Sequence, residues 1–61
     1  MNRPYQIMGS ILTLGTVMAP SFNDALVRWA RERGYPSWET YRDAMGIERV
    51  SFDGGGRITL H

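Results

Sequence analysis

Two serines that can cap helices, each followed by a glycine that can end one, divide residues 20–46 into two short helices. Ser21 precedes a periodic apolar run that stops at Gly34, and Ser37 precedes a second run that stops at Gly46. A serine hydroxyl accepts a hydrogen bond from the free amides of the first helical turn, and glycine readily takes the left-handed conformation that ends a helix. The spacing predicts two helices joined by three or four residues, the length used in helix-turn-helix and αα-hairpin motifs.

Each predicted helix has one apolar side and one charged side. The apolar side chains that we expect to face the core are Phe22, Ala25, Leu26 and Trp29 in the first helix, and Trp38, Tyr41 and Met45 in the second. The charged side chains that fall opposite are Asp24, Arg28, Arg31, Glu39, Arg42 and Asp43. Because Arg28 lies four residues from both Asp24 and Glu32, ion pairs along the first helix are expected.

The N-terminal stretch at residues 5–16 combines β-branched and aromatic residues with two glycines. This composition favours one bent strand or a short hairpin about Gly9 and Ser10, with a buried helix as the competing interpretation. The wider apolar run at residues 7–19 is interrupted by small and polar residues and is shorter than the roughly 20 residues of a membrane span. We therefore interpret it as a core strand and expect no membrane partner.

Beyond residue 47 the apolar pattern has a period of two, which predicts a C-terminal β-hairpin. Placing its four apolar side chains on one face pairs Phe52 with Ile58 and Val50 with Leu60, and leaves a five-residue loop at residues 53–57. The glycines at 54–56 are followed by a strand and no lysine, so a hairpin tip is favoured over a nucleotide-binding loop.

The fold class predicted from these elements is α+β. The 61 residues are expected to form a single small two-layer domain, with an N-terminal strand or hairpin, two short helices in helix-turn-helix arrangement, and a C-terminal β-hairpin that joins or packs beside the first strand. The core is expected to hold nine residues: Phe22, Leu26, Trp29, Trp38, Tyr41, Val50, Phe52, Ile58 and Leu60.

Composition argues against several functional classes. Cysteine is absent, which favours a cytoplasmic protein without disulfides or thiolate metal ligands, and the single histidine, His61, has no partner for metal binding. Every carboxylate has an arginine within four residues, so ion pairing is favoured over acid–base catalysis. We expect no enzyme activity and no cofactor, and the net charge of only +1 means that any anion must be bound by a local patch.

Aromatic and arginine residues near the turn between the helices are the candidate binding residues. Two interpretations stay open for the tryptophans: both belong to the core, or Trp38 or Tyr35 is partly exposed as an interface anchor. The residues expected to contact nucleic acid or a protein partner are Arg28, Arg31, Tyr35, Trp38, Arg42 and Arg57.

Residues 28–52 contain an arginine-bearing helix that ends at a glycine, followed by a proline and a tyrosine-arginine helix. The residues of this pattern are Arg31, Gly34, Pro36, Ser37, Tyr41, Arg42, Gly46, Ser51 and Phe52. The arrangement resembles a segment of the animal-type haem peroxidases. The asparagine that supports the proximal haem ligand in that family would fall at Leu26, and neither haem histidine has a counterpart, so the resemblance implies a shared helical scaffold or a chance match, without haem chemistry.

Residues 11–36 place a short strand before a helix with the pattern Arg28, Trp29 and Arg31. This order resembles the start of the excisionase and MerR-type winged helices, and the later glycine-tipped hairpin would correspond to the wing. An extra helix at residues 37–45 separates the two. The resemblance implies a DNA-binding regulator, with Arg57 on the wing.

Two functions follow as expectations. The first is a small winged-helix-like nucleic-acid-binding regulator, in which Arg28, Arg31 and Arg42 contact phosphates or bases. The alternative is a small inhibitor or adaptor of the phage or mobile-element type, which binds a protein through its aromatic and arginine surface. The partner is accordingly DNA or a protein, and a chain this short is also a possible homodimer.

Overall fold

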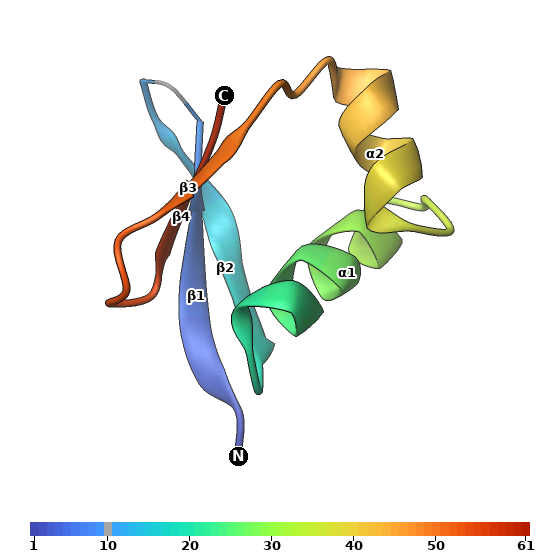
Figure 1. Ribbon diagram of the computed structural model, residues 1–61. Helices are drawn as coiled ribbons and strands as arrows, with labels where there is room; N and C mark the ends of the chain where they lie inside the picture. Colours follow the sequence, from blue (N-terminus) through green and yellow to red (C-terminus); the bar gives the residue numbers. More distant parts are fainter. Residues whose placement is uncertain (10) are drawn as a thin grey trace.

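Six elements form a two-layer α+β fold in the computed structural model, which describes residues 1–9 and 11–61 (Figure 1). In chain order they are β1 (Arg3–Met8), β2 (Thr13–Ala19), α1 (Phe22–Glu32), α2 (Trp38–Met45), β3 (Val50–Phe52) and β4 (Arg57–Leu60). The fold class expected from the sequence is confirmed.

The four strands form one sheet in the order β2-β1-β4-β3. The first and last strands, β1 and β4, are parallel neighbours at its centre, whereas β2 and β3 lie at the two edges and each pairs antiparallel with its hairpin partner. The C-terminal hairpin thus joins the first strand directly, and both helices lie on the same side of the sheet (Figure 1).

The sequence left open whether the N-terminal stretch is one bent strand or a short hairpin, and the structure shows a hairpin. Gly9 donates its backbone N–H to the carbonyl of Leu12 at 2.7 Å, and the strand register shifts between Ile7 and Met8. Ser10, on which the predicted turn was partly based, lies outside the described residues. The second strand ends at Ala19, which is also the last residue of the apolar run that was interpreted as a strand.

Both helices begin and end where the sequence predicts. The hydroxyl oxygen of Ser21 accepts a hydrogen bond from the backbone N–H of Asp24 at 3.3 Å, and that of Ser37 accepts one from Thr40 at 3.1 Å. Gly46 follows α2 with φ 70°, a left-handed conformation that costs a glycine little.

The C-terminal hairpin has the predicted register. Val50 pairs with Leu60 and Phe52 with Ile58, which leaves residues 53–57 between the last paired positions. One carboxylate oxygen of Asp53 accepts hydrogen bonds from the backbone N–H groups of Gly55 at 2.8 Å and Arg57 at 3.0 Å. These two bonds hold the glycine-rich turn in place.

The core lies between the helices and one face of the sheet. Its buried residues are Tyr5, Ile7, Val17, Ala19, Ala25, Leu26, Trp29, Ala30, Tyr41, Ile58 and Leu60, with Phe22, Tyr35, Trp38, Ile47 and Val50 packed against them. Two predictions were wrong. Phe52 is 41% exposed because it lies on the short edge strand β3, and Met45 is 52% exposed because α2 packs mainly against α1 and its last turn lies at the periphery.

The apolar run at residues 7–19 is only partly core, which corrects its interpretation as a core strand. Ile7, Val17 and Ala19 are buried in the core, but four other apolar side chains of this run are between 44% and 91% exposed: Ile11, Leu12, Leu14 and Met18. The physical reason is that the helices cover only one face of the sheet (Figure 1).

Candidate functional site

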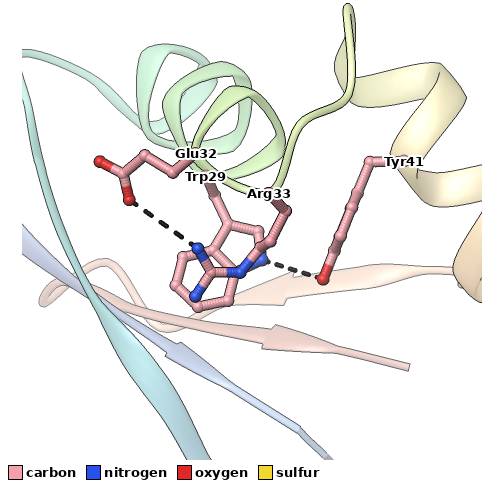
Figure 2. A network of polar contacts seen from close by, with 4 residues as sticks. All are labelled: Trp29, Glu32, Arg33 and Tyr41. Atoms are coloured by element: carbon pink, nitrogen blue, oxygen red, sulfur yellow. Dashed lines mark hydrogen bonds and ion pairs between the residues drawn. The ribbon is translucent and has the colours of Figure 1, made fainter.

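Trp29 connects helix α1 to β2 and α2, and Figure 2 shows it beside Arg33 and Tyr41. Its indole N–H donates a hydrogen bond to the hydroxyl of Tyr41 in α2 at 3.1 Å, and its ring packs against the backbone of Gly15 in β2. The guanidinium of Arg33 stacks on the same ring, with its central carbon 3.4 Å from the ring centroid. Arg33 was not among the residues predicted from the sequence, although its position four residues after Trp29 is the spacing at which helical side chains meet.

Two of the predicted binding arginines donate to backbone carbonyls of this chain. Arg28 donates from Nη1 to the carbonyl of Met18 at 2.8 Å. Arg42 donates from Nε to the carbonyl of Ile47 and from Nη2 to that of Glu48, both at 3.0 Å. Arg28 thereby connects α1 to the edge strand β2, and Arg42 fixes the segment that leads from α2 into β3.

The ion pairs predicted along α1 do not form, because Arg28 turns towards β2 and away from Asp24 and Glu32. Among the described side chains, the one ion pair joins Glu32 and Arg33 at 3.9 Å, and both groups are exposed. Such a contact contributes little to stability.

Arg31 and Arg57, the other two predicted arginines, lie on different surfaces. Arg31 is exposed on α1, whereas Arg57 begins β4 and faces the side of the sheet without helices, because its neighbour Ile58 faces the core. The structure therefore does not bring the four predicted arginines together on one surface.

The predicted aromatic residues do meet. Tyr35 and Trp38 both pack against the ring of Tyr41, with centroid distances of 5.3 Å and 5.7 Å. Each is half-buried, so the two interpretations of these aromatics are combined: Trp29 belongs to the core, and Tyr35 and Trp38 cover its hydrogen-bond partner while keeping part of their surface in solvent.

A groove of about 260 Å³ lies on the uncovered face of the sheet, beside the β3–β4 turn. Its lining residues are Pro4, Gln6, Thr16, Asp53, Gly55, Gly56 and Arg57. The hydrogen bonds from the backbone of Arg57 and Gly55 lower the pKa of the Asp53 carboxyl below its ordinary value of 3.8, because they stabilise the ionised form.

Four of the seven exposed large apolar side chains in the described part of the chain lie in β2 or just before it. We call this group the β2 surface, and it consists of Ile11, Leu12, Leu14 and Met18. These residues follow one edge strand and the turn before it. The run that contains them was interpreted as a core strand, because an apolar run does not reveal which of its faces is covered.

The remaining polar groups form local contacts. His61 is exposed, and its Nε2 lies 2.9 Å from the hydroxyl of Ser51 on the neighbouring strand. Within residues 1–9 and 11–61, no three histidine or acidic side chains are grouped so as to hold a metal ion. Neither described helix has the length and apolar character needed to cross a membrane.

In three separate comparisons, no protein-family model, no curated protein and no solved structure matches the chain.

Proposed function

We propose that this chain is a binding module that recognises another protein through the β2 surface. The observation that carries the proposal is the exposure of Ile11, Leu12, Leu14 and Met18 on one edge strand and its turn. Large apolar side chains that stay in solvent contribute little hydrophobic stabilisation to a chain of 61 residues, whose stability margin is thin. A group of them on one surface is typical of a site that is covered by a partner.

The arrangement of the arginines also supports a protein partner. Arg28 and Arg42 are held by backbone carbonyls of the chain itself, and Arg31 and Arg57 lie on separate surfaces. Affinity for nucleic acid comes largely from several cations that contact successive phosphates together. A dispersed set of arginines with a net charge of +1 supplies this only weakly.

The proposal can be tested by affinity capture with the full chain in lysate of the organism that encodes it. We expect one stoichiometric protein to be retained by the native chain and lost with the double substitution Leu12→Ser and Leu14→Ser. The matched control is Met45→Ser, which changes an equally exposed apolar residue on α2 and should retain the partner. Equal retention by the double variant, or retention of no protein, would show that the β2 surface does not bind one.

A nucleic-acid-binding regulator of winged-helix type is the second candidate that we propose. It is favoured by Arg57, which lies at the C-terminal hairpin turn beside Gln6 and Thr16 in the groove of the uncovered sheet face. Binding to duplex DNA that weakens steeply with added salt, and that Arg57→Gln reduces, would support this candidate. Absence of binding to any duplex at low salt would remove it.

A further inference from the structure

The outer edge of β2 carries backbone groups that no other strand of the sheet uses. Gln6 donates its backbone N–H away from β2, to the carbonyl of Gly56 before β4 at 2.7 Å. Gln6 and its β2 partner Thr16 therefore form a non-hydrogen-bonded pair of the antiparallel ladder. The backbone groups of Thr16 therefore point away from the sheet, as do those of Met18, two residues later. The contact between Arg28 and the Met18 carbonyl is consistent with this direction.

The two sides of this edge differ in chemistry. On the uncovered face of the sheet, Leu14 and Met18 present exposed apolar side chains on either side of Thr16. On the helix side, Arg28 reaches the edge at Met18, and Nη2 of Arg33 lies 3.9 Å from the position that a Cβ would take on Gly15. The edge is thus lined by apolar side chains on one face and by two guanidinium groups on the other.

We propose that an extended segment of a partner protein, in which apolar and acidic residues alternate, pairs antiparallel with β2 as a fifth strand. Successive side chains of a strand point to opposite faces, so the apolar residues of this segment contact Leu14 and Met18 while its carboxylates face Arg28 and Arg33. Arg28 uses one of its five N–H groups at Met18, so others remain for a carboxylate. The inference rests on the proposed function and names the chemistry of the partner.

A second copy of this chain fits the edge poorly. In a symmetric antiparallel pair centred on Thr16, Met18 of one copy would lie opposite Leu14 of the other. Arg28 of one copy would then approach Arg33 of the other, because Arg33 lies beside Gly15. This repulsive contact between guanidinium groups would occur twice in the symmetric dimer, and β2 has no carboxylate to compensate for it. The charges therefore disfavour self-pairing and favour an acidic strand.

The test uses blocked seven-residue peptides and the amide spectrum of the full ¹⁵N-labelled chain. The probe alternates valine and glutamate, and we expect it to shift the amide resonances of Thr16 and Met18 and to slow their hydrogen exchange. A peptide with lysine in place of glutamate should bind at least about tenfold more weakly, because its charges face Arg28 and Arg33. Unchanged exchange at Thr16 and Met18 would overturn the proposal.

Two N-methylated peptides test the backbone pairing. In an antiparallel strand the residues whose side chains lie beside Leu14 and Met18 also direct their N–H groups at β2. Methylation of the valine amides should therefore weaken binding by roughly tenfold or more, since at least two hydrogen bonds are lost. Methylation of the glutamate amides, which point away from β2, should leave binding nearly unchanged. Equal affinity of the two methylated peptides would contradict strand pairing.

Variants of the chain separate this inference from the proposed function. Arg28→Gln and Arg33→Gln should each weaken binding of the glutamate peptide several-fold, whereas the charge-matched control Arg49→Gln, which is exposed just before β3 at the opposite edge of the sheet, should not. Arg28→Gln keeps the test valid if loss of the stacking on Trp29 unfolds the Arg33 variant. If the glutamate peptide does not bind at β2 while capture of the partner still depends on Leu12 and Leu14, the strand-pairing proposal is wrong and the proposed function stands. If capture fails as well, both are wrong.

Discussion

At the scale of single residues, the environment of Trp29 shows how so short a chain is held together. The indole ring is 2% exposed and lies between the backbone of Gly15 and the guanidinium of Arg33, while its N–H is bound by Tyr41. One side chain thus connects β2, α1 and α2. A change at any of its neighbours should be measurable in the free energy of unfolding.

Gly15→Ala should destabilise the fold, because the added Cβ would lie 3.0 Å and 3.1 Å from two ring carbons of Trp29. Overpacking of this kind costs about 1–3 kcal/mol in the free energy of unfolding, which can be measured by urea denaturation followed by circular dichroism. The matched control is Gly55→Ala, whose Cβ would meet its nearest neighbour at 3.7 Å. If both variants unfold at the same urea concentration as the native chain, the close contact at Gly15 is not present in solution.

Tyr41→Phe should leave the buried indole N–H of Trp29 without its hydrogen-bond acceptor. An unsatisfied buried donor costs about 1–3 kcal/mol in unfolding free energy, whereas the loss of an exposed hydroxyl is nearly neutral. Tyr35→Phe is the control, because Tyr35 is half-buried and its hydroxyl makes no hydrogen bond among the described residues. A Tyr41 variant as stable as the Tyr35 variant would show that the bond contributes nothing.

At the scale of elements, local hydrogen bonds at the ends of helices and strands determine how each element is connected to the next. Ser37 begins α2, Gly46 ends it, and Arg42 then holds the carbonyls of Ile47 and Glu48 on the way to β3. In the turn between β3 and β4, the Asp53 carboxylate accepts hydrogen bonds from two backbone N–H groups. Arg42 was predicted as a binding residue, but the bonds that it makes in the structure are to its own chain.

The β3–β4 turn should lose stability in acid. The folded-state pKa of Asp53 is lowered, so its contribution is fully present above about pH 4 and is lost as the pH falls through the folded pKa, where the carboxylate takes up a proton. Nuclear magnetic resonance of the Asp53 carboxyl carbon should give a midpoint below 3.8. A midpoint at or above that value would mean that the two backbone bonds do not persist in solution.

Substitutions at Asp53 provide a second readout of the same turn. Asp53→Asn keeps an oxygen acceptor but cannot titrate, so the difference in melting temperature between the native chain and this variant should shrink as the pH falls from 5 to 2. Asp53→Ala removes the acceptor and should melt at a lower temperature than the native chain even at pH 7.

At the scale of the whole molecule, the sheet depends on the two ends of the described chain. Strands β1 and β4 pair at its centre, although about fifty residues separate Ile7 from its partner Ile58. Both side chains are fully buried. Each hairpin alone has two strands and would be marginally stable, so the pairing of β1 with β4 is what creates a four-stranded sheet and a continuous core.

Deletion of residues 57–61 should therefore unfold the whole chain. It removes Ile58 and Leu60 from the core, each worth about 1.5–3 kcal/mol, from a domain whose total stability is of the order of 3–9 kcal/mol. Deletion of residues 1–2, which precede β1, is the control and should preserve the fold. The amide spectrum distinguishes the outcomes, since a dispersed spectrum after the first deletion would show that β1, β2 and the helices are stable without β4.

The features that sequence predicted correctly are those determined by neighbouring residues. Ser21 and Ser37 cap their helices, and alternation alone gives the register of Val50 and Phe52, because these signals act over a few residues. The direction in which β4 joins β1 was not predicted, since it depends on the path of the chain through both helices. For the same reason, sequence could not show that Arg28 turns to a carbonyl of β2.

The candidate site was predicted only in part. Tyr35 and Trp38 were predicted as candidate binding residues, and the structure shows both half-buried beside Tyr41. The apolar run that contains the β2 surface was interpreted as a core strand, but these residues are exposed. The apolar character of Leu14 and Met18 does not indicate whether their face of the sheet is covered by a helix or exposed to solvent. Only the structure shows that α1 packs against the other face.

The central pairing of β1 with β4 also has a consequence for synthesis of the chain. At about 5–20 residues per second, a ribosome needs roughly 2–8 s to add the residues between the end of β2 and the end of β4. During that interval the residues of the first hairpin are all present, but the helices that cover one of its faces and the strand β4 that pairs with β1 are still being added. The four-stranded sheet can therefore form only after β4 has been synthesised, late in translation of the described chain.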